Sequence, residues 1–92
     1  QPQQATEICT QVPTSNPLYQ ENCFHGLGWA VAEKRSVDES LAFCGGLPMH
    51  PDSCLLGLSA HAKRLDPEAA LALCGRVERS DLRGRCEGFA RR

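Results

Sequence analysis

The pattern of hydrophobic and polar positions along the chain changes near Cys23. Before that residue, three prolines and many polar side chains give no periodic stripe, so we expect an extended tail and loop over residues 1–22. After it, apolar residues recur at helical spacing in two stripes: Phe24, Leu27 and Val31, then Leu55, Leu58, Ala62 and Leu65. The pattern predicts a single all-α domain over residues 23–92, built from about five short helices.

Capping residues place the boundaries of the middle helices. Ser36, with Glu39 three residues later, forms a capping box that opens a short helix. Asp66 followed by Pro67 predicts the start of another helix. Residues 45–51 contain two glycines and two prolines, so we expect an irregular segment there.

The two halves of the domain repeat the same plan. Cys23 to Cys54 spans 31 residues, and the interval from Cys44 to the next equivalent cysteine is 30. This period divides the domain into repeats 23–53 and 54–85, followed by a truncated third copy.

Glycines inside the first helix of each repeat need an explanation. Gly26, Gly28 and Gly57 each cost about 1 kcal/mol relative to alanine in a helix interior. Gly26 and Gly57 occupy matching repeat positions, so we expect close helix packing to offset this cost.

Six cysteines in 92 residues indicate a disulfide framework and an oxidising compartment. Within the repeat, the cysteines form three groups, each joining the end of one helix to the start of the next. This predicts the local pairs Cys9–Cys23, Cys44–Cys54 and Cys74–Cys86. The rival pattern staples each hairpin internally, as Cys23–Cys44 and Cys54–Cys74, and leaves Cys9 with Cys86.

Two physical arguments on the pairing point in opposite directions. Loop entropy mildly favours the rival, at roughly 3.3 to 4.5 kcal/mol per longer loop against roughly 2.7 per local bridge. Helix length favours the local pattern, because a first helix of about 12 residues rises roughly 18 Å and a return helix of about eight descends roughly 12 Å. Cys44 then need not come level with Cys23. We adopt the local pattern and keep the rival open.

Composition and charge narrow the class of protein. A net charge of −1 with 41% hydrophobic residues excludes a nucleic-acid-coating polycation and a chain too polar to fold. No run approaches the roughly 20 apolar residues that cross a bilayer. The cysteines lack the close spacing typical of zinc sites. The chain starts at Gln1, and we expect the mature part of a secreted or periplasmic protein whose signal peptide has been removed.

Candidate recognition residues lie outside the repeat pattern. His25 and Trp29, one turn apart, form a second face of the first helix, where the second repeat has apolar Leu56 and Ala60. They either pack under the proline-rich loop or contact a partner or ligand. Residues 76–92 carry six arginines against three acidic residues. This basic end predicts a partner contact, for which the candidates are Arg83, Arg85 and Arg91. Without interleaved aromatic residues, nucleic acid is not expected.

We therefore expect a non-enzymatic module that binds another protein, of the inhibitor, immunity-protein or assembly-factor type, with no catalytic residue and no cofactor. The alternative is small-ligand or copper binding, with Met49 and His50 as weak copper candidates. Across Cys23 to Cys86, the helical-hairpin plan resembles disulfide-stabilised repeat proteins such as the Sel1-like, cysteine-rich families. This chain lacks their Tyr and Gly-Asp signatures, and the resemblance implies no functional residue.

Overall fold

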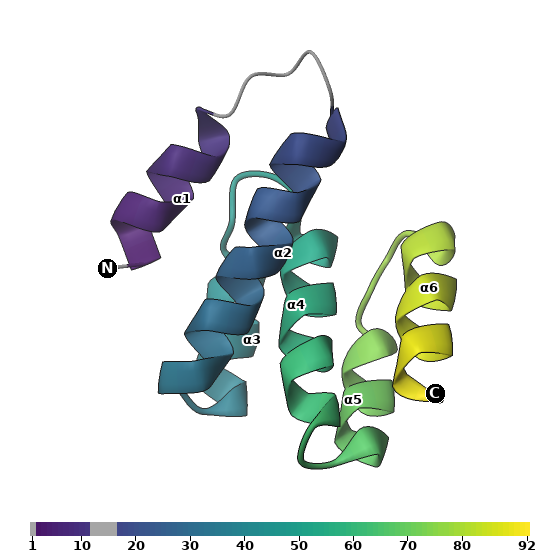
Figure 1. Cartoon of the computed structure of the whole chain (residues 1–92). Helices are drawn as coiled ribbons and strands as arrows, with labels where there is room; N and C mark the ends of the chain where they lie inside the picture. The colour runs from purple at the N-terminus through teal and green to yellow at the C-terminus, as the bar shows by residue number, and fades with distance from the viewer. Residues whose placement is uncertain (1, 12–16) are drawn as a thin grey trace.

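The computed structural model describes residues 2–11 and 17–92, which form six helices (Figure 1). The helices are α1 (Pro2–Thr10), α2 (Pro17–Lys34), α3 (Val37–Gly45), α4 (Pro51–Lys63), α5 (Pro67–Cys74) and α6 (Ser80–Ala90). The described residues contain no strand, so the predicted all-α fold is confirmed. The hairpins α2–α3 and α4–α5 share the order of a long helix followed by a shorter one, as the repeat predicts.

The N-terminal segment differs from the expected tail. Residues 2–10 form α1, and α2 begins at Pro17 rather than at Cys23, so the prediction of extended chain over residues 1–22 is wrong for these parts. Both α1 and α2 begin at a proline, a residue that suits the first helical position because the N–H group there has no partner within the helix. Residues 12–16 lie outside the described part of the chain.

Capping follows the sequence closely in the middle of the chain. The Ser36 hydroxyl accepts a hydrogen bond from the Glu39 amide at 3.1 Å, and the Glu39 carboxylate accepts one from the Ser36 amide at 3.2 Å. Asp66 caps α5 in the predicted way. The segment before α4 differs from the prediction at its end. Pro51 is the first residue of α4 instead of part of the irregular segment, and His50 before it has a left-handed backbone conformation with a φ of 54°.

Three disulfides join successive helices: Cys9–Cys23, Cys44–Cys54 and Cys74–Cys86. These are the local pairs that the repeat predicts, and the rival pairs do not form. The bridged Cα atoms lie 5.5 to 5.6 Å apart, within the range that a disulfide accepts. Such bonds persist in oxidising compartments, so the structure fits a protein of that kind of environment.

The predicted apolar stripes supply part of the core. Phe24, Leu27 and Val31 are buried together with Cys9 beneath α1. In the second repeat, Leu55 and Leu58 are buried with residues of α5 and α6.

The second stripe ends earlier than predicted. Leu65 is 84% exposed because α4 stops at Lys63, two residues before it. No helix in the described residues combines the length and apolar character needed to cross a membrane.

The long helices α2 and α4 cross with their backbones in contact. A Cβ atom at Gly28 would overlap the carbonyl oxygen of Cys54 and lie 2.8 Å from its carbonyl carbon. A Cβ atom at Gly57 would overlap the carbonyl oxygen of His25 and lie 2.9 Å from the amide nitrogen of Trp29. The two glycines therefore serve one crossing from opposite sides, which accounts for their presence in helix interiors.

Gly26 does not take part in this crossing. Beyond the adjoining residues and backbone of α2, no described atom lies within 4 Å of a Cβ built there, so the expectation of close packing at Gly26 is wrong, although the repeat equates it with Gly57. The repeat therefore matches the positions in sequence but not in packing.

Gly57, which lies at the crossing, and Gly26, which does not, give a matched test of the crossing. We expect Gly57→Ala to lower the free energy of unfolding by about 1–3 kcal/mol, because the α2 backbone must move away. Gly26→Ala should raise it by up to about 1 kcal/mol, because alanine favours the helix and meets no neighbour. Guanidinium unfolding followed by circular dichroism, with disulfides intact, measures both changes. Equal effects of the two substitutions would contradict the crossing described here.

Candidate functional site

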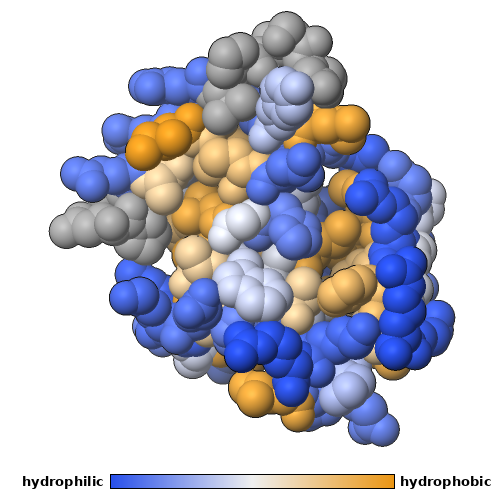
Figure 2. Space-filling model, in the orientation of Figure 1, coloured by the Kyte–Doolittle hydropathy of each residue, from blue (hydrophilic) through white to orange (hydrophobic). Residues whose placement is uncertain are grey.

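A groove runs along α4 between α2 and α6. Both flanking helices pack on α4, and among the described residues their backbones do not contact each other. The space left between them has a volume of about 710 Å³ and is lined by residues of all three helices. In Figure 2 apolar side chains show in a hollow beside α4, with hydrophilic side chains on its rim.

Apolar side chains line the floor of the groove beside Ser59, and others stand near its ends with the charged Asp81 and Arg92. Leu56 and Ala60 lie one turn apart on α4 and are half-buried in the floor. Phe89, 43% exposed, stands at one end. A smaller hollow continues the groove from Leu56 to Leu18, which is 58% exposed.

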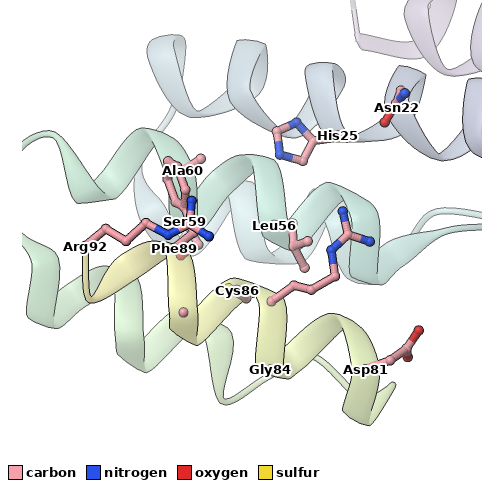
Figure 3. Close-up of a pocket in the computed structure, with 12 residues that line it drawn as sticks. Asn22, His25, Leu56, Ser59, Ala60, Asp81, Gly84, Cys86, Phe89 and Arg92 are labelled. Carbon is pink, nitrogen blue, oxygen red and sulfur yellow. The ribbon is translucent and has the colours of Figure 1, made fainter.

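Two glycines form part of the α6 wall. Gly84 and Gly88 lie one turn apart and line the groove, and Figure 3 shows the position of Gly84 on α6. A Cβ built at either position has no described atom within 4 Å beyond the adjoining residues and backbone of α6 itself. Each glycine costs the helix about 1 kcal/mol relative to alanine. Unlike Gly28 and Gly57, neither is required by packing within the described part of the chain.

Positive charge predominates along the groove. Arg85 and Arg92 line it, and neither forms an ion pair with any residue that the structure describes. The two nearby acidic side chains are both occupied by Arg79, whose guanidinium lies 2.8 Å from Asp81 and 3.2 Å from Glu21. Hydrogen bonding from Arg79 also holds the pKa of Asp81 below its usual value.

His25 faces the groove from α2. Figure 3 shows its ring directed toward the space above α4, with Asp81 and Arg92 at opposite ends of the view. Partial burial lowers the pKa of His25 below its ordinary value of 6.5, and the positive charge of Arg85 lowers it further. The imidazole is therefore neutral near pH 7 and can donate or accept a hydrogen bond.

Helix α4 holds α6 at both ends. The buried carboxylate of Asp52 accepts hydrogen bonds from the amides of Glu78 at 3.1 Å and Arg79 at 2.9 Å, just before α6 begins. At the other end, Lys63 Nζ donates to the Phe89 carbonyl at 2.6 Å and lies 4.2 Å from the centre of its ring. These contacts hold α6, one wall of the groove, on α4, which forms its floor.

The predicted recognition residues separate in the structure. His25 and Arg85 line the groove, whereas Trp29 packs edge-on against His61, with ring centroids 5.0 Å apart. The loop under which His25 and Trp29 were expected to pack includes residues 12–16, outside the described chain. Arg83 donates to a backbone carbonyl and Arg91 ends α6, and neither lines the groove.

The weak copper candidates lie in the cluster around Phe24. His50 Nε2 is 3.0 Å from Gln20 Oε1, its ring centroid is 5.5 Å from that of Phe24, and Met49 packs on the same cluster. Among the described residues, no group of three or more His, Cys, Asp or Glu side chains is placed to hold a metal ion. The copper hypothesis stays untested.

Sequence analysis missed most of the groove-lining residues. Leu56 and Ala60 were noted only as the apolar counterparts of His25 and Trp29, and Arg92 only as part of the basic end. The exposed glycines of α6 were the available signal, because Gly84 and Gly88 weaken a helix at one-turn spacing.

A second groove of about 500 Å³ borders α2 near α1 and α3. Its lining includes Ala5 and Val31, and its charged residues are of mixed sign: Lys34, Arg35 and Glu39. The lining of the first groove has the same balance of two positive charges and one negative, but there the negative charge, on Asp81, is paired with Arg79.

Comparisons with protein-family models, with curated proteins and with solved structures gave no match. The resemblance to Sel1-like proteins therefore stays at the level of plan, and the site is argued from its own geometry.

The neutral state of His25 predicts a specific pH dependence of stability. Its folded pKa lies below the unfolded value near 6.5, so the unfolded chain binds the proton first as pH falls. This contribution to the free energy of unfolding is complete above pH 6.5 and is lost as pH falls through the folded pKa. We expect His25→Gln to flatten the pH–stability curve below pH 6.5 relative to wild type. A His25 NMR titration midpoint at or above 6.5 would refute the assignment.

Proposed function

We propose that this chain is a non-enzymatic protein-interaction module of an oxidising compartment, secreted or periplasmic, that binds another protein through the groove between α2 and α6. The observation that carries the proposal is a groove with an apolar floor and two exposed apolar ends, Leu18 and Phe89. Such contiguous apolar surface with a polar rim is typical of protein-binding sites.

The rigidity of the scaffold supports the same function. The groove is bordered by helices that three disulfides and the contacts of Asp52 and Lys63 hold in place. A preformed surface loses little conformational entropy on binding, which favours affinity. This property suits an inhibitor, an immunity protein or an assembly factor.

The alternative, small-ligand or copper binding, has weaker support. Its candidate residues do not gather at one place: His25 lines the groove, Trp29 packs on His61, and Met49 and His50 lie at the Phe24 cluster. A ligand site would therefore use different residues from those predicted.

A pair of glycine substitutions tests the proposal. Gly88→Trp places a large side chain in the groove, and Gly45→Trp adds the same side chain at an equally open position on α3, outside the groove. Tagged wild type and both variants are used to capture partners from the native secretome or periplasm. We expect one polypeptide to be retained by wild type and Gly45→Trp and to be reduced at least tenfold with Gly88→Trp.

Two results would count against the function. One is a polypeptide retained equally by all three proteins, because its binding would not involve the groove. The other is the absence of any polypeptide retained specifically by the wild type.

A further inference from the structure

We propose that the groove binds an acidic, amphipathic α-helical segment of the partner, about three turns long. This inference rests on the proposed function and names the partner's chemistry. It follows from three separate features of the groove: the direction of its apolar strip, the glycines of its wall and the spacing of its arginines.

The apolar strip has the form that a helix face requires. Leu56 and Ala60 follow the axis of α4, and Leu18 and Phe89 extend the strip at its two ends. A helix with apolar residues at three- and four-residue spacing presents a matching linear stripe. The α6 wall has 11 residues, so the occupant needs roughly 16 Å, or about 11 residues.

The glycines of α6 allow a second backbone to approach the wall. Within the fold, Gly28 and Gly57 show what glycine does in this chain, since each permits contact between two helix backbones. Gly84 and Gly88 have the same one-turn spacing as interhelical small residues generally, yet none of the six described helices covers them. A docked helix would make the contact that offsets their cost to α6.

The charge of the groove selects an acidic helix. Arg85 lies in α6 and Arg92 lies two residues past its end, seven residues further along the chain, and seven residues of helix rise roughly 10 Å. Carboxylates spaced seven residues apart on a docked helix would meet both guanidinium groups. Asp81 and Glu21 both contact Arg79, and no described acidic side chain forms an ion pair with Arg85 or Arg92. Positive charges distributed along an apolar strip favour such a helix over a single small anion.

Selection from a display library of random 16-residue peptides on the disulfide-bonded protein tests the inference. We expect enriched peptides to be acidic, to become helical on binding, and to bind less tightly as salt increases. Fluorescence anisotropy should show at least a tenfold loss of affinity for the double variant Arg85→Glu/Arg92→Glu. The matched control Arg35→Glu/Arg76→Glu makes the same charge change outside the groove and should stay within twofold of wild type. Peptides with lysine in place of glutamate should bind the first variant again.

Several outcomes would overturn the inference. These are enriched peptides that are neutral, basic or extended, equal losses for the two double variants, and full displacement by inorganic phosphate at constant ionic strength, which would indicate a small-anion site.

The two proposals fail separately. If the Gly88→Trp variant loses its native partner while acidic helices are not selected, the groove binds protein of another kind. If acidic helices are selected at the groove but native capture ignores Gly88→Trp, the proposed function fails.

Discussion

The crossing of α2 and α4 at Gly28 and Gly57 is the contact on which the arrangement depends. The two backbones lie so close that a methyl group at either glycine would overlap the opposite helix. This contact determines how the two helices pack against each other. Cys54, which contacts Gly28 at this crossing, forms a disulfide with Cys44 and so ties α3 to α4. Because α2 packs on α4 at these glycines, it does not cover the neighbouring face of α4, which carries Leu56 and Ala60.

Helix α6 completes the groove because α4 also determines its position. Asp52 accepts hydrogen bonds from the amides of Glu78 and Arg79, the two residues before α6, and Lys63 donates one to the carbonyl of Phe89 near the end of α6. The disulfide Cys74–Cys86 ties α6 to α5. One central helix therefore provides the floor of the groove and the supports of one wall.

Sequence patterns predicted the features that depend on neighbours in the chain. The capping box at Ser36 and the three disulfide pairs follow from local spacing, and the structure contains them. The helix α1 and the start of α4 at Pro51 were missed, because proline was taken as a breaker where it is the first helical residue. The groove required three helices separated in sequence to converge. No local signal distinguishes Gly57, which contacts the backbone of α2, from Gly26, where an added Cβ would meet no described atom of another helix.

The central claim is that a partner lies on α4 between α2 and α6. Isotope-filtered NMR of the labelled protein with a bound, unlabelled partner segment measures its position directly. The account predicts intermolecular contacts from the segment to the methyl groups of Leu56 and Ala60 and to the ring of Phe89. Contacts concentrated instead at Ala5 and Val31 in the second groove, with none to the α4 methyl groups, would contradict it.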